Sequence, residues 1–141
     1  MDCNGLVRGP CAADIVSRQA SGIRKRWLVS NFLSGELAGT YWGIGSAVSH
    51  YETTVEGYSD GLVSEVIAEV RTDLDRFSEA EQDVLENHGY LLAAAAAEKH
   101  LGHLAPSNVP LQIPYPEWMN EDQVRIALRD SSKHKLPFGR R

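Results

Sequence analysis

Apolar side chains recur at spacings of three and four residues in the longest patterned stretch of the chain, between Ser78 and Leu101. This period places them on one face of an α-helix. Ser78 followed by Glu81 forms a capping box, which satisfies two backbone N–H groups at the helix start. We therefore predict one long helix within Thr72–Leu101 that starts at Ser78. Its apolar stripe consists of Val84, Leu85, His88, Leu91, Leu92, Ala95 and Ala96.

Three positions in this helix carry further expectations. Gly89 costs about 1 kcal/mol relative to Ala inside a helix, so it predicts close approach of another element. Asn87 falls among the charged residues of the opposite face, where we expect it to meet water. His88 lies on the stripe and is expected to be a hydrogen-bonded core residue rather than a general base.

A second helix is predicted over Asp14–Ser34, after an irregular segment at 1–11, and Ser34-Gly35 provides its stop signal. Its polar side carries several basic residues, a pattern more typical of a solvated face than of a phosphate contact. These are Arg18, Arg24, Lys25 and Arg26. Its apolar face consists of Val16, Ala20, Ile23, Trp27, Leu28 and Phe32.

The segment Gly39-Thr40-Tyr41-Trp42-Gly43-Ile44 is rich in residues that favour β-structure and is bracketed by glycines. We interpret it as a short strand. Trp42 should then be largely buried against the two long helices, and its replacement by Ala should cost about 3–5 kcal/mol.

The composition changes after Leu104, where four prolines follow at positions 106, 110, 114 and 116. They predict an extended linker without regular structure. Asn120 with Gln123 then signals a short helix that ends at Leu128 or Arg129, with Val124, Ala127 and Leu128 on one side. The basic tail, Asp130–Arg141, is expected to be a solvated terminus, with a contact to anionic lipid headgroups as the alternative.

The length of 141 residues is that of one domain, and 43% hydrophobic residues is ordinary for a soluble protein. A net charge of −5 gives no overall attraction to nucleic acid. Cys3 and Cys11 are too few for a disulfide framework or a zinc site, so we expect free thiols in a reducing compartment. The first residues do not resemble a signal peptide, and the longest apolar run, Leu91–Ala97, is too short to span a membrane. We therefore expect a cytoplasmic protein with at most peripheral membrane contact.

One stretch matches a catalytic pattern, since Gly57-Tyr58-Ser59-Asp60-Gly61 has the form Gly-x-Ser-x-Gly. Such an elbow follows a buried strand, whereas the residues before this one, 49–56, are mostly polar. Asp60 next to the serine would also oppose a developing oxyanion. The residues that follow, 62–70, have helical spacing. We therefore do not assign Ser59 as a nucleophile.

His100 and His103 could share one helical face, but no carboxylate or cysteine at ligand spacing completes a metal site. Gly102 and Pro106 indicate that the helix ends there, where histidine is favourable against the helix dipole. We predict no metal, cofactor-binding or catalytic residue in this chain.

Two blocks of the sequence resemble bacterial patatin-like phospholipases. The first is Gln19 with Arg24-Lys25-Arg26, followed by Gly39–Ile44, which is similar to a "Q-x-x-x-x-R-x-R" helix and the family's "G-x-Y-W-G-I". The second is Thr72–Glu81 followed by Leu85 and His88-Gly89-Tyr90, which is similar to "R-T-x-L-x-x-F/L-S-D-x-E" and "L-x-N-x-G-Y". The resemblance covers about Ala12–Leu104, with the two blocks in the family's order.

The resemblance implies an acyl hydrolase with a Ser–Asp dyad and a glycine-rich oxyanion loop, all upstream of the matched region. Asp60-Gly61 resembles the family's Asp-Gly pair, but Leu62 replaces the second small residue and the position differs, so the catalytic Asp is not carried over. We therefore expect the C-terminal part of a patatin domain, without the dyad.

These observations predict a mostly α-helical chain with one or two short strands, a C-terminal fragment of an α/β three-layer patatin-type sandwich. Residues 1–11 are an irregular segment, 12–104 the patatin-like part, and 105–141 a proline-rich linker with a short helix and basic tail. Because the rest of the sandwich is missing, apolar faces should be exposed, and the chain should self-associate or bind an upstream catalytic half.

Three functions remain open. The leading one is a patatin-like phospholipase, a lipid acyl hydrolase of lipid metabolism, present as a C-terminal piece that is inactive alone. The substrate of the complete domain would be a lipid or acyl ester. The second is a non-catalytic interaction protein that binds a partner through its exposed helix stripe. The third is a serine esterase that uses Ser59.

Overall fold

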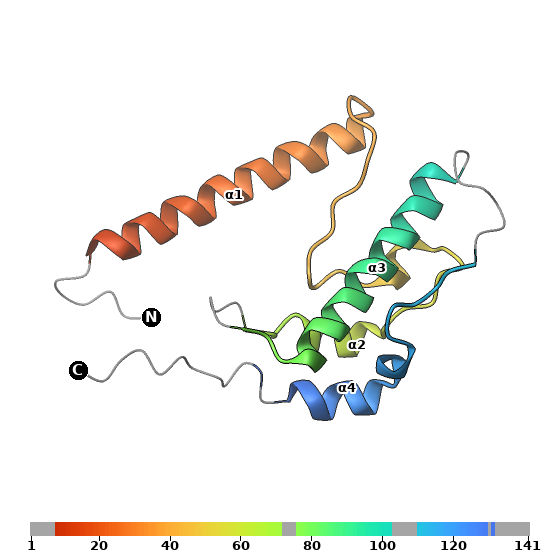
Figure 1. Ribbon diagram of the computed structural model, residues 1–141. Helices are drawn as coiled ribbons and strands as arrows, with labels where there is room; N and C mark the ends of the chain where they lie inside the picture. Colours follow the sequence, from red (N-terminus) through yellow and green to blue (C-terminus); the bar gives the residue numbers. More distant parts are fainter. Residues whose placement is uncertain (1–7, 72–75, 103–109, 130, 132–141) are drawn as a thin grey trace, which may run out of the picture. The chain divides into compact units, whose positions relative to one another are not determined.

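The computed structural model describes residues 8–71, 76–102, 110–129 and 131. All regular elements in these ranges are helical, and no strand occurs among them. In chain order they are α1 (Arg8–Ser34), η1 (Val48–Tyr51), α2 (Asp60–Leu62), η2 (Val63–Ile67), α3 (Glu79–Leu101), η3 (Pro116–Met119) and α4 (Glu121–Leu128), as Figure 1 shows. The chain divides into two compact units, Met1–Tyr41 and Trp42–Arg141.

The first unit contains α1, which confirms the predicted helix and extends it. It begins at Arg8, inside the segment expected to be irregular. It ends as predicted, because Gly35 adopts a left-handed φ of 78° after the last helical residue. The predicted apolar face is divided: Leu28 and Phe32 are half-buried, whereas Val16, Ile23 and Trp27 are 62–63% exposed.

The predicted strand at Gly39–Ile44 is wrong. This segment is irregular and ends in a turn, in which the Gly43 N–H donates to the Ser46 hydroxyl over 3.0 Å. Trp42 is 38% exposed, so its expected burial is also wrong. A strand needs a neighbouring strand to take up its backbone hydrogen bonds, and the described residues provide none.

In the second unit, α3 confirms the capping box and the stripe. The Glu81 N–H donates to the Ser78 hydroxyl over 3.2 Å, and the Ser78 N–H donates to the Glu81 carboxylate over 2.6 Å. Every predicted stripe residue is buried except Leu85, which is half-buried. Two expectations are wrong: Asn87 is buried, and Gly89 is exposed with no atom within 4 Å of where a Cβ would lie.

Two apolar clusters cover the stripe of α3. Near its first turns, α2 and α4 lie alongside it (Figure 1), and this cluster contains Ala47, Tyr58, Leu62, Val63, Ile67, Val70, Val84, Val124 and Leu128. Along its second half, η1 contributes to the other cluster, which contains Val48, Tyr51, Leu91, Leu92, Ala95 and Ala96. The partly buried Met119 packs against both clusters. The stripe that we expected to be exposed is therefore covered within the chain.

The segment expected to be an extended linker supplies part of this cover. Pro116 opens η3, a 3₁₀ turn, because proline is tolerated at the first position of a helix. The predicted cap of α4 is confirmed, since the Gln123 N–H donates to the Asn120 side chain over 3.1 Å. Of the residues predicted to share one side of α4, Val124 and Leu128 are buried, whereas Ala127 is exposed. Ser131 is buried, although we expected a solvated tail from Asp130 onward.

None of the described helices is both long enough and apolar enough to cross a membrane.

Candidate functional site

A buried ion pair joins the start of α3 to Arg71, which lies four residues after the end of η2. The Arg71 Nε lies 3.3 Å from the Glu81 Oε1, and both side chains are about nine-tenths buried or more. The guanidinium also donates to the Arg76 carbonyl over 2.6 Å and lies 5.5 Å from the centre of the Phe77 ring. Arg71 therefore fixes the chain on both sides of the connection that leads into α3.

Glu81 is the centre of this network. Its carboxylate accepts hydrogen bonds from the Ser78 N–H and the Ser131 hydroxyl in addition to Arg71. Burial alone would raise its pKa, but the hydrogen bonds from Arg71, Ser131 and Ser78 outweigh burial and lower the pKa to about 2. A carboxylate with so low a pKa is a poor general base at neutral pH. We call this arrangement the Arg71–Glu81 clasp, and it consists of Arg71, Phe77, Ser78, Glu81 and Ser131. It is suited to stabilising the fold.

The sequence indicated only part of the clasp. The capping box indicated Ser78 and Glu81 but not Arg71. Ser131 lies 50 residues from Glu81, and no local pattern links the two. Thr72–Asp75, which follow Arg71 in the sequence, lie outside the described residues.

Ser59 is a helix cap in this structure. Its hydroxyl accepts from the Leu62 N–H at the start of α2 and donates to the Glu121 carboxylate over 2.7 Å. The Ser59 backbone N–H also donates to Glu121 over 2.7 Å, and these two bonds lower the pKa of Glu121. A carboxylate with a lowered pKa is a weaker base, so this pair is ill-suited to activating a serine.

The glycines around Ser59 have ordinary packing roles. A Cβ at Gly57 would lie 2.6 Å from a methyl of Val48, so this glycine is required by the contact with η1. A Cβ at Gly61 would meet only the end of the Arg125 side chain, at 3.7 Å. The preceding residues are irregular rather than a strand. Gly57–Gly61 therefore lacks the geometry of a nucleophile elbow.

Asp60 contacts a second serine and a histidine without forming a triad. The Ser49 hydroxyl donates directly to Asp60, and the His50 Nε2 lies 4.0 Å from the other carboxylate oxygen. In a catalytic triad the imidazole lies between serine and carboxylate, whereas here both groups contact the carboxylate. His50 and Asp60 are each 65% exposed, so their attraction is weak.

The other two histidines of the described ranges, His88 and His100, have contacts that suit a structural role. His88 is a hydrogen-bonded core residue, as predicted: its Nε2 donates to the Ile44 carbonyl over 2.9 Å, and burial lowers its pKa. The His100 ring meets the Tyr51 ring edge-on, with centroids 6.4 Å apart, while His103 lies outside the described residues. No cluster of three or more histidine, cysteine or acidic side chains suited to a metal ion occurs in the described ranges.

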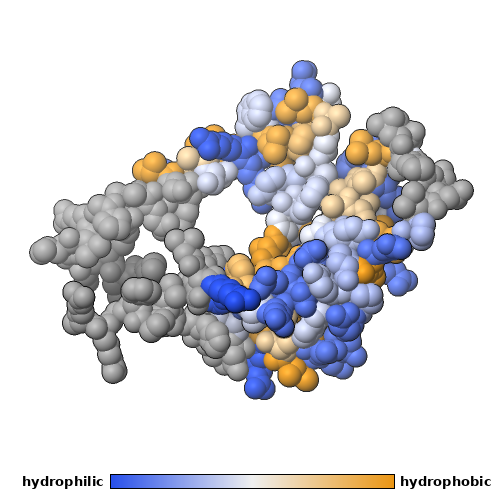
Figure 2. Space-filling view, in the orientation of Figure 1, coloured by the Kyte–Doolittle hydropathy of each residue, from blue (hydrophilic) through white to orange (hydrophobic). Residues whose placement is uncertain are grey.

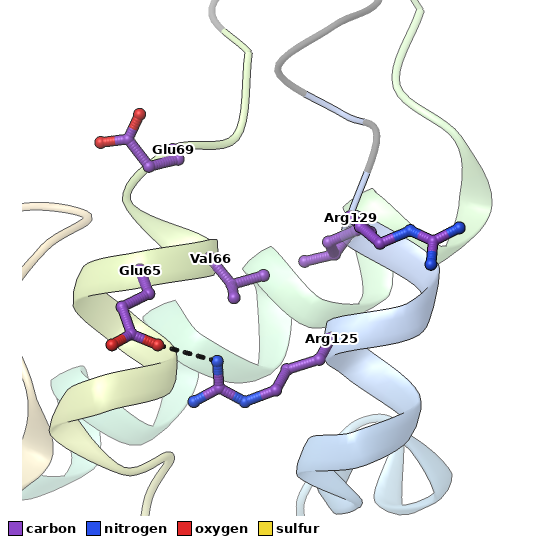
Figure 3. A pocket seen from close by; sticks show the side chains of 6 residues that line it. Glu65, Val66, Glu69, Arg125 and Arg129 are labelled. Carbon is purple, nitrogen blue, oxygen red and sulfur yellow. Dashed lines mark hydrogen bonds and ion pairs between the residues drawn. The ribbon is translucent and has the colours of Figure 1, made fainter.

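A hollow of about 280 Å³ lies between η2 and α4. Arg125 crosses it to form an ion pair with Glu65 at 2.9 Å (Figure 3). In the same view Glu69 and Arg129 point away from this pair. The charges at the rim therefore neutralise each other or diverge, and they do not converge on a ligand.

Comparisons of the chain with protein-family models, with curated proteins and with solved structures give no match.

Proposed function

We propose that this chain is a C-terminal portion of a patatin-like lipid acyl hydrolase that lacks the catalytic dyad and stabilises the domain. The resemblance in two ordered blocks supports the family. The observation that carries the proposal is the Arg71–Glu81 clasp. Phe77, Ser78 and Glu81 belong to the second block of the resemblance, and Arg71 directly precedes it. These residues contact one another through a buried ion pair, a ring contact and a capping box.

The described hydroxyl groups favour a non-catalytic role. Ser59 donates to a carboxylate of lowered pKa, and Ser49 donates to an exposed aspartate. Neither serine lies on the tight strand-to-helix turn that a nucleophile elbow requires, because no strand precedes either of them in the described residues, so neither is positioned as a nucleophile. In this proposal the nucleophile, the aspartate and the oxyanion donors come from another polypeptide segment.

Two assays test this proposal. The purified chain should not hydrolyse p-nitrophenyl butyrate or octanoate above the background rate, and Ser59→Ala should leave that rate unchanged. Esterase activity that disappears in Ser59→Ala would instead establish the esterase function. The second assay adds a polypeptide that carries the family's Ser–Asp dyad and glycine-rich loop but ends before the segment matched by Ala12–Leu104.

That polypeptide should gain activity when it is co-expressed with this chain. Glu81→Ala, which breaks the clasp, should reduce the gain, whereas Glu69→Ala on the exposed rim of the hollow should not. Binding without any gain in activity would favour the interaction-protein alternative. Because the stripe of α3 is buried within the chain, such a partner would need a different face.

A further inference from the structure

The two units differ in the sign of their charge. Met1–Tyr41 contains five basic and three acidic side chains, whereas Trp42–Arg141 contains nine basic and sixteen acidic ones. Within α1 the contrast is sharper, because Val16–Ser34 contains four basic residues and no acidic one. Because the whole chain has a net charge of −5, this positively charged helix is the segment suited to contact an anionic surface.

Four large apolar side chains are exposed among the described residues of this helix, and three of them share one line, whereas Leu33 near the helix end lies off it. Val16, Ile23 and Trp27 follow one another at spacings of seven and four residues, which places them along one line of an α-helix. They are 63%, 63% and 62% exposed, respectively. We call them the α1 apolar line. In Figure 2 the coloured part of this helix carries both hydrophobic and hydrophilic side chains.

Two arginines border the α1 apolar line. At about 100° per residue, Arg24 lies roughly a quarter turn to one side of it and Arg26 roughly a quarter turn to the other. Both are exposed. Lys25 lies on the opposite side of the helix, where its ammonium group is 4.8 Å from the centre of the Tyr41 ring. An apolar line with a guanidinium on each flank matches the boundary between acyl chains and phosphate headgroups.

We propose that α1 binds the surface of an anionic phospholipid bilayer, with Val16, Ile23 and Trp27 entering the interface and Arg24 and Arg26 contacting lipid phosphates. Trp27 suits this position because indole rings partition to the headgroup level of a bilayer. A nucleic acid would use the charges of α1 but not its apolar line. The inference goes beyond the proposed function, since surface binding needs no catalytic residue in this chain or in a partner.

The test measures binding of the full chain to vesicles by co-sedimentation. Vesicles of phosphatidylcholine with 30% phosphatidylglycerol should bind the chain, while pure phosphatidylcholine should bind it much more weakly. Binding should fall as salt is raised, because the arginine contacts are screened. No hydrolysis is measured, so a failure of the acyl hydrolase proposal would leave this result unaffected.

Two double variants with matched controls separate charge from apolar contact. Arg24→Gln with Arg26→Gln should weaken binding to the anionic vesicles by about 30-fold, at roughly a tenfold loss for each 1.4 kcal/mol and about 1 kcal/mol per basic residue. Lys99→Gln with Arg129→Gln changes the net charge equally in the other unit and should have little effect.

Ile23→Gln with Trp27→Gln should weaken binding about 10-fold or more. The matched control for this apolar pair is Leu111→Gln with Ile126→Gln, which replaces two exposed apolar residues of the other unit.

Circular dichroism shows whether each variant retains its helices, which is expected because the substituted side chains are all exposed or half-exposed. Absence of binding by the folded chain would overturn the proposal. Equal losses of vesicle binding in the variants and their controls would also overturn it. The same holds for binding that Ile23→Gln with Trp27→Gln leaves unchanged. A concentration-dependent dimer abolished by that same pair, without vesicle binding, would show that a second copy covers the α1 apolar line.

Discussion

The two long helices, α1 and α3, have similar patterns of apolar residues but differ in how far those residues are buried. Both carry apolar residues at helical spacing, over 27 and 23 residues respectively. On α3, Val84, Leu91, Leu92 and Ala95 are at most 1% exposed. On α1, Val16, Ile23 and Trp27 are more than 60% exposed. Periodicity therefore shows that a helix has an apolar face, but it does not show what covers that face.

The difference lies in residues far away in the sequence. The stripe of α3 is covered by residues from two distant segments, 47–70 and 113–128. Each fully buried leucine contributes about 1.5–3 kcal/mol relative to an exposed one. Buried hydrogen bonds add to this apolar packing. The Asn87 side chain donates to the Tyr115 carbonyl over 2.7 Å and accepts from the Tyr115 N–H over 3.0 Å. The predictions below test this contrast, from the largest effect to the smallest.

Removal of the clasp carboxylate should have the largest effect. Glu81→Ala removes the carboxylate from the buried ion pair with Arg71 and from the hydrogen bonds with Ser78 and Ser131, which should reduce the free energy of unfolding of the Trp42–Arg141 unit by about 3–5 kcal/mol. Urea denaturation followed by circular dichroism measures this loss. Glu79→Ala, an exposed acidic residue in the same helical turn, is the control. A loss below 1 kcal/mol for Glu81→Ala would contradict the role of the clasp.

A paired truncation compares the two apolar faces directly. Leu91→Ala empties a fully buried site on α3 and should cost about 3 kcal/mol. Ile23→Ala shortens an exposed side chain on α1 and should change stability by less than about 0.5 kcal/mol. Equal losses from the two substitutions in the same urea experiment would mean that the face of α1 is as well packed as that of α3.

The clasp should also make stability depend on pH in the acid range. The pKa of Glu81 is lowered from 4.5 to about 2 in the folded chain, so the unfolded chain binds the proton more readily. The stabilisation is complete above pH 4.5 and is lost as the pH falls toward 2. Between pH 6 and pH 3 the loss due to Glu81 should be about 2 kcal/mol.

Other carboxylates also titrate in this range, so the measured quantity is the difference between the wild type and Glu81→Gln. The gap in stability between the two proteins should narrow as the pH falls from 6 to 3. A stability difference that stays constant would show either that Glu81 is already protonated at pH 6 or that its pKa is not shifted in the folded chain.

Loss of the helix cap should have the smallest effect. Ser78→Ala removes the side chain that accepts from the Glu81 N–H and should cost about 1 kcal/mol. Ser78→Gly should cost less, because glycine at this position costs only a few tenths of a kcal/mol. If both variants retain wild-type stability in urea, the cap is redundant with the Arg71–Glu81 contact.

Local signals in the sequence determined the helices and their ends. The capping box at Ser78–Glu81, the Asn120–Gln123 cap and the left-handed Gly35 each depend on residues within a few positions of one another. Hydrogen bonds and φ angles of this kind form wherever the local chain is helical, whatever packs around it. This is why the boundaries of α3 and α4 and the end of α1 could be predicted.

Tertiary structure alone decided which positions are covered. Gly39–Ile44 has β-favouring residues but no strand to pair with, and Asn87 is buried only because the Tyr115 backbone satisfies its amide. Ser131 joins the clasp across 50 residues of sequence. Pairing and burial depend on where distant segments come to lie, and the spacing of residues along one helix carries no information about that placement.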